Sequence, residues 1–109
     1  MTNVQEWTMV QCRDWLAEQD GWKRHGRGWW KKNGGYGGRN YEDHPHEPTL
    51  DGAAKALPSG WTLEMNEHEL TAWPKAKNKN CVQLPATDNE TLDRYRLAVL
   101  TRMTEERPT

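Results

Sequence analysis

The sequence predicts a single domain of the α+β class, in which a mostly antiparallel sheet of three or four strands packs with three helices in a layered sandwich. The chain has 109 residues, about the length that one hydrophobic core organises. Helical spacing of apolar residues occurs in three segments, and alternation of apolar and polar residues separates the last two. The expected order is therefore helix, short strand, helix, three strands, helix.

The first helix is predicted from the signals at its two ends. Thr8 and Gln11 have the spacing of a capping box, in which each side chain accepts a hydrogen bond from the other residue's free main-chain N–H. The helix should therefore begin at Met9. Gly21 supplies the left-handed residue that ends such a helix, and Trp22 should fold back on it.

The next twenty residues, 22–41, differ in composition from the rest of the chain, and we call them the basic aromatic segment. They contain six Lys or Arg and five aromatic residues but no acid, and their glycines disfavour a helix. We expect a short strand at Gly28–Lys32 and a glycine-rich turn after it. The following residues, 42–48, are acidic and contain two prolines, which favour an extended connector.

A second helix should begin after Thr49, whose hydroxyl can cap it, and should stop at residues 58–60, which read Pro-Ser-Gly.

Seven tryptophans, three tyrosines and no phenylalanine are available to the core. Each large aromatic side chain can remove roughly 150–250 Å² from water, so tryptophan must supply much of the buried surface.

Three short strands should follow as a meander. Residues 61–66 alternate strictly between apolar and polar side chains, and residues 81–84 form a strand that Pro85 stops. The middle strand, residues 70–76, contains Pro74, which predicts that this strand lies at an edge or carries a bulge.

The last helix is predicted from a second capping box at Thr87–Glu90. Apolar residues at helical spacing give it a core face, made of Leu92, Tyr95, Val99 and Met103. Residues 105–109 are expected to fray.

The block from Thr49 to Trp61, which reads TLDGAAKALPSGW, precedes a hairpin with Trp73 and a closing helix at residues 92–100. This arrangement, from Thr49 to Met103, resembles small phage and prophage proteins of the ABA-sandwich type. The resemblance implies a phage or mobile-element origin and a layered α/β/α arrangement. Its motifs are structural and identify no site residue.

The basic aromatic segment is the candidate binding site. Basic side chains attract phosphates or carboxylates, and exposed aromatic rings stack on bases at about 1–3 kcal/mol each. The alternative is a glycine hairpin in which Trp29 or Trp30 fills the core and the lysines are merely solvated. Strand alternation sends these two tryptophans to opposite faces. Within the predicted contact surface, residues 23–41, the candidate contact residues are Arg27, Trp29, Trp30, Lys31, Lys32, Tyr36, Arg39 and Tyr41.

The net charge of −1 argues against an extended nucleic-acid footprint. A local basic cluster on such a chain suits a host protein or a nucleotide ligand, bound without catalysis. The phage origin that the resemblance implies adds the expectation of a phage accessory protein, such as an inhibitor of CRISPR or another defence system. The alternatives are nucleic-acid binding through the same segment, or a structural role in a phage particle. It stays open whether the acidic connector folds back and masks the basic segment.

Other functions lack a motif. His44 and His46 are close in sequence and have acids beside them, but no second Cys or His cluster completes a zinc site, so we expect no metal and no cofactor. No nucleophile motif or phosphate-binding loop is present, so we expect no enzyme. Cys12 and Cys81 are interpreted as small buried hydrophobic residues. Without an export signal or a membrane span, a soluble protein of the host cytoplasm is expected.

Overall fold

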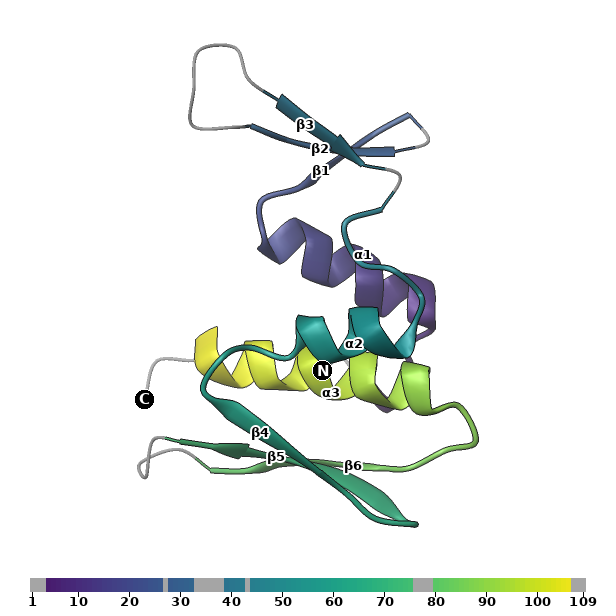
Figure 1. Cartoon of the computed structure of the whole chain (residues 1–109), viewed down its shortest axis with the longest axis vertical. Helices are drawn as coiled ribbons and strands as arrows, with labels where there is room; N and C mark the ends of the chain where they lie inside the picture. The colour runs from purple at the N-terminus through teal and green to yellow at the C-terminus, as the bar shows by residue number, and fades with distance from the viewer. Residues whose placement is uncertain (1–3, 27, 33–38, 43, 76–79, 107–109) are drawn as a thin grey trace.

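The computed structural model describes residues 4–26, 28–32, 39–42, 44–75 and 80–106, and its longest helix, α3, lies across the middle of the molecule (Figure 1). Helices α1 and α2 pack against α3, and one sheet covers the side of α3 that is turned away from α1. A second sheet lies beyond α1. In chain order the elements are η1 (Val4–Glu6), α1 (Met9–Gln19), β1 (Lys23–His25), β2 (Gly28–Lys32), β3 (Arg39–Glu42), α2 (Leu50–Ala56), β4 (Trp61–Met65), β5 (Glu69–Pro74), β6 (Val82–Pro85) and α3 (Glu90–Glu106).

The predicted α+β class is confirmed, and the described strands form two antiparallel three-stranded sheets rather than one sheet of three or four strands. β4, β5 and β6 are the expected meander. The expected strand at Gly28–Lys32 is β2, but it pairs with two strands that the sequence did not predict, β1 and β3. The connector is shorter than expected because its first residue, Glu42, ends β3.

The ends of α1 are as predicted. The Thr8 hydroxyl accepts a hydrogen bond from Gln11 N–H, and the Gln11 side chain accepts one from Thr8 N–H, which completes the capping box. At the other end Gly21 has a φ of 92°, and the main-chain N–H of Trp22 donates to the carbonyl of Ala17. This bond closes a Schellman motif and turns the chain toward β1.

The prediction that Pro74 places its strand at an edge or in a bulge is wrong, because β5 is the central strand of its sheet and its register with β4 is unbroken from Trp61–Pro74 to Met65–Leu70. β6 pairs only with residues 69–72 and so ends before Pro74. The neighbouring Lys75 N–H donates to the carbonyl of Gly60 on the β4 side. By alternation the nitrogen of Pro74 faces the side where β6 has already ended, and no ladder hydrogen bond is lost there.

The start of α3 also differs from the prediction. The side chain of Asn89 accepts a hydrogen bond from Leu92 N–H at 3.0 Å, so Asn89 rather than Thr87 caps the helix. Thr87 instead donates its main-chain N–H and its hydroxyl to the carboxylate of Asp93, both at 2.7 Å. The expected capping box is therefore absent, because the Thr87 side chain bonds a residue one turn further along the helix.

Two hydrophobic clusters use different faces of α3. Tyr95 and Val99 pack with α1 and α2, whereas Leu97 packs with β4, β5 and β6. Glu105, which was expected to fray, belongs to α3 and accepts a hydrogen bond from Trp61 Nε1 at 2.7 Å. Residues 107–109 lie outside the described chain. No helix among the described residues is long and apolar enough to cross a membrane.

Candidate functional site

The sheet β1-β2-β3 contains most of the predicted contact residues. Its register pairs Trp30 with Tyr41 and Lys32 with Arg39, so these four positions lie side by side on adjacent strands. Arg27 and Tyr36 lie outside the described residues.

The two neighbouring tryptophans have different surroundings, as alternation predicts. Trp29 is only 4% exposed, and its ring centroid lies 5.2 Å from that of His44. Trp30 is half-buried, and Lys23 Nζ lies 5.9 Å from the centroid of its ring, within the range of a cation–π contact. Trp29 therefore joins the sheet to the rest of the molecule, and Trp30 is the tryptophan of β2 that a partner can reach.

Trp22 lies outside the predicted contact surface of residues 23–41, and Lys23 lies within it but was not named as a contact residue. Lys23 contacts Trp30, whereas Trp22 contacts Lys31, which by alternation lies on the same face of β2 as Trp29. The ring of Trp22 has Lys31 Nζ 5.9 Å from its centroid, which gives a second cation–π contact. The sequence signal that could have predicted the β1-β2 hairpin, which places Lys23 opposite Trp30, was Gly26. This glycine has a φ of 60° and lies between His25 and Gly28, which pair with each other. Tight hairpin loops of this length require positive φ.

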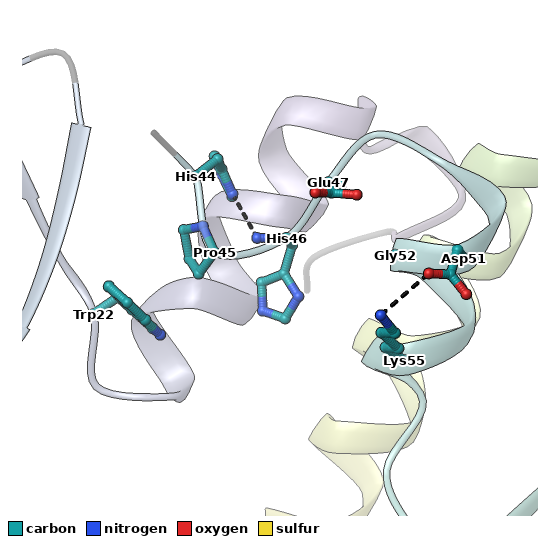
Figure 2. A pocket seen from close by; sticks show the side chains of 8 residues that line it. All are labelled: Trp22, His44, Pro45, His46, Glu47, Asp51, Gly52 and Lys55. Carbon is teal, nitrogen blue, oxygen red and sulfur yellow. Dashed lines mark hydrogen bonds and ion pairs between the residues drawn. The ribbon is translucent and has the colours of Figure 1, made fainter. Parts of the chain in front are cut away.

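The chain leaves β3 through residues 44–47, which we call the histidine connector. His44 bonds through both ring nitrogens. Its Nε2 lies 2.9 Å from Asp14 Oδ1 of α1, and its Nδ1 accepts a hydrogen bond from the main-chain N–H of His46 at 3.0 Å (Figure 2). Because Nδ1 accepts, His44 is the neutral tautomer with its proton on Nε2, which donates to Asp14.

His46 contacts the other end of α1. Its Nε2 lies 3.2 Å from Asp20 Oδ2, and the other oxygen of Asp20 accepts a hydrogen bond from Arg102 Nη2 of α3 at 2.6 Å. The main-chain carbonyl of His46 accepts a hydrogen bond from Arg13 Nε at 2.8 Å. His46 is thus connected to both α1 and α3.

Burial governs the protonation of both imidazoles. It is the largest influence on the pKa of His44 and of His46, and it lowers both below the ordinary 6.5. The hydrogen bonds to Asp14 and Asp20 act in the opposite direction but are the smaller effect. Both connector histidines are therefore neutral at neutral pH.

A pocket of about 290 Å³ opens between the histidine connector, the start of β1 and α2 (Figure 2). Trp22 and Pro45 lie at one end of it, His46 in the middle, and the exposed ion pair of Asp51 with Lys55 at the other end. The pocket gives water access to the connector, where the side chains of His44 and His46 are 15% and 12% exposed.

The two connector histidines do not share a metal shell. Within the described ranges no group of three or more His, Cys, Asp or Glu residues is placed to hold a metal ion. His44 and His46 instead bond separate carboxylates of α1. Sequence reasoning missed Asp14 and Asp20, because no local pattern links them to histidines 30 and 26 positions away.

The described part of the acidic connector turns toward α1 and lies against Trp29, on the helix side of the sheet.

Comparisons with protein-family models, with curated proteins and with solved structures gave no match. The resemblance of residues 49–103 to ABA-sandwich phage proteins stays a sequence-based prediction.

Proposed function

We propose that this protein acts by binding rather than by catalysis, and that the sheet β1-β2-β3 is the surface that contacts an acidic partner protein. The observation that carries the proposal is that none of the described residues of this sheet belongs to either hydrophobic cluster. The sheet lies at one end of the molecule, beyond α1 (Figure 1). Apart from Trp29, which is buried against His44, this sheet is not used to build the hydrophobic clusters, so it is well placed to make contacts with another molecule.

The charge distribution supports an acidic partner. The basic aromatic segment holds six of the fifteen Lys and Arg residues of the chain and none of its sixteen Asp and Glu residues. The rest of the chain is therefore net acidic. Such a separation of charge orients an approaching acidic surface toward β1-β2-β3 and repels it elsewhere. On β1, Lys23 and Arg24 are both exposed.

Trp30 supplies the apolar part of this surface. Interfaces are enriched in Trp and Arg, whose side chains combine contact area with polar atoms. Lys23 lies over the Trp30 ring, so a carboxylate that pairs with Lys23 reaches the edge of the aromatic surface as well. A protein partner is favoured over nucleic acid because the chain as a whole carries a charge of −1, unlike a basic nucleic-acid-binding domain.

A binding role also agrees with the state of the reactive side chains. Burial raises the pKa of Cys12 to about 11, so this thiol is protonated at neutral pH and is a poor nucleophile. The Nε2 atoms of His44 and His46 both contact carboxylates of α1. That the partner belongs to a host defence system rests only on the resemblance of residues 49–103 to phage proteins.

The proposal is tested by capturing partners from bacterial lysate, with and without nuclease treatment, using the wild-type chain and a Lys23→Glu/Arg24→Glu variant. The control is Lys55→Glu/Lys75→Glu, which makes the same change of charge at exposed sites outside this sheet. We expect an acidic protein that the wild type and the control retain and the β1 variant loses. Equal capture by all three chains contradicts the proposal. Capture that disappears after nuclease treatment, with a steep dependence on salt, indicates nucleic-acid binding instead.

A further inference from the structure

We propose that the histidine connector is a pH-sensitive attachment: it holds the sheet β1-β2-β3 against α1 while His44 is neutral, and protonation of His44 loosens the sheet. This inference concerns the chain alone. It does not depend on which partner the sheet binds, or on whether it binds one.

The geometry of His44 permits only the neutral ring. Nδ1 accepts the main-chain N–H of His46, and Nε2–H donates to Asp14. An imidazolium carries a hydrogen on both nitrogens. The added hydrogen would point at the His46 N–H group, so this hydrogen bond would be lost and the turn from 44 to 46 would have to change.

His44 is also the point where the second sheet rests on the helices. Its ring packs against the buried ring of Trp29 of β2, with 5.2 Å between the centroids. The cation–π contact of Lys31 with Trp22 lies on the same side of the sheet as Trp29. Movement of His44 therefore removes the surface that covers Trp29.

The charged groups around His44 oppose its protonation on balance. Burial is the largest effect, and the guanidinium groups of Arg13 on α1 and Arg24 on β1 add to it. The carboxylate of Asp14 favours the imidazolium but does not outweigh them. The third element in contact, β2, presents the uncharged Trp29 ring.

The surroundings of His46 also favour its neutral ring. Burial, the charge on His44 and the Arg102 guanidinium of α3 lower its pKa, while Asp20 of α1 raises it. Tyr95 of α3 packs edge-on to its ring, at 6.5 Å between centroids, and contributes no charge. On the α2 side the pocket carries the exposed pair of Asp51 and Lys55, which nearly balance each other. A charged His44 also disfavours a charged His46.

The direction of the response follows from these shifts. In the detached state His44 is solvated and its pKa returns toward 6.5, so that state takes up a proton at a higher pH than the attached state. Detachment therefore becomes more favourable as the pH falls below about 6.5, by about tenfold for each unit of difference between the two pKa values. The pocket lets protons reach the ring without prior unfolding.

The test is hydrogen exchange of the main-chain amides, corrected for intrinsic rates, at about pH 7.5 and about pH 5.5, on either side of the ordinary histidine pKa. In the wild type we expect protection of β2 amides to fall severalfold at the lower pH while protection of α3 amides is retained. The informative variant is His44→Asn. Its side-chain oxygen can accept the same main-chain N–H two residues on, but it does not titrate. Protection of β2 in this variant should fall much less at the lower pH than it does in the wild type.

The matched control is His68→Asn, which alters an exposed histidine in the β4-β5 turn and should behave as the wild type does. The proposal is overturned if β2 protection in the wild type is the same at both pH values, or if His44→Asn shows the same loss as the wild type. Should His44→Asn not fold, titration of the wild-type His44 ring by NMR decides. A midpoint at or above about 6.5 contradicts the proposal, and a lower midpoint with simultaneous shifts of β2 amides supports it.

Discussion

The hydroxyl group of Tyr95, on the buried face of α3, donates a hydrogen bond to the main-chain carbonyl of Glu47, the last residue of the histidine connector. Burial raises the pKa of Tyr95, so the hydroxyl remains a donor at neutral pH. This bond joins the connector to the main hydrophobic cluster, and not only to α1. The path of the chain between the two sheets is therefore set from both ends of the connector.

Replacing Tyr95 with Phe should lower the free energy of unfolding by about 0.5–1.5 kcal/mol, the usual net value of one hydrogen bond. The ring itself is fully buried and stays in place. Urea denaturation followed by circular dichroism measures the change. Tyr95→Ala is the comparison, because it also leaves a cavity and should cost about 3–5 kcal/mol. Equal costs for the two variants would mean that the hydroxyl stabilises more than the ring does.

Gly52 of α2 lies where Tyr95 and Glu47 meet. A Cβ at this position would overlap the Glu47 carbonyl oxygen and would lie 2.8 Å from the Tyr95 hydroxyl. We expect Gly52→Ala to destabilise the protein by about 1–3 kcal/mol, the cost of overpacking, despite the better helix propensity of alanine. The control is Ser59→Ala at an exposed position, which should change stability by less than about 0.5 kcal/mol. A stabilising Gly52→Ala would show that the connector can move away from α2.

Local sequence signals predicted the elements whose ends are determined within a few residues. Thr8 with Gln11, Gly21, and Thr49 with Gly52 all behave as their spacing indicates. Two predictions were wrong because the outcome depends on more distant residues. Pro74 is acceptable in a central strand only because β6 ends early, and the Thr87 hydroxyl bonds Asp93 instead of capping the helix.

The sequence predicted the candidate binding segment by its composition, but not the way in which it is attached. Alternation correctly separated Trp29 from Trp30, yet which of the two faces the helices depends on the path of the whole sheet. The pairing of His44 with Asp14 and of His46 with Asp20 joins segments 30 and 26 residues apart. Such contacts have no short-range pattern, so a metal site was the nearest hypothesis that the residues His44 and His46 themselves offered.

The two cysteines should differ in reactivity. Cys12 is fully buried, and burial raises its pKa to about 11, whereas Cys81 is partly exposed, and both are free thiols. At about pH 8 we expect a thiol reagent to modify one cysteine per folded chain rapidly and the second only in denaturant, because thiolate content and access govern the rate. Cys81→Ser should abolish the fast reaction. Two fast thiols in the wild type would contradict the packing of α1 against α3.

Asp93 should be the most sensitive polar residue of α3. Its carboxylate is 2% exposed and accepts both hydrogen bonds from Thr87. Asp93→Ala should cost about 1–3 kcal/mol, because it removes the acceptor of both Thr87 donors. Thr87→Ala should cost less, and the double variant should cost less than the two single changes together, since both remove the same contact. The exposed neighbour Asp88 provides the control, and Asp88→Ala should change stability little. Strict additivity at Thr87 and Asp93 would contradict the pairing.

The pH dependence of global stability provides a test of whether burial or ion pairing dominates at the connector. Burial lowers the pKa of His44 and His46 from 6.5, so the unfolded chain takes up their protons at a higher pH than the folded chain does. Their contribution therefore makes the free energy of unfolding decrease as the pH falls below about 6.5, and it vanishes above that value, where both states are neutral. The wild type must be compared with a variant that keeps the carboxylates of Asp14 and Asp20, so that the two proteins differ only in the imidazoles.

The variant is His44→Asn/His46→Gln, in which the amide oxygen of Asn replaces Nδ1 of His44 as acceptor and the amide nitrogen of Gln replaces Nε2 of His46 as donor to Asp20. Denaturant unfolding of both proteins between about pH 5 and pH 8, where the histidine charge changes, gives the difference in stability. We expect the wild type to lose stability relative to the variant as the pH falls. If it gains stability instead, the pairs of imidazolium and carboxylate outweigh burial, and acid strengthens the attachment of the second sheet to α1.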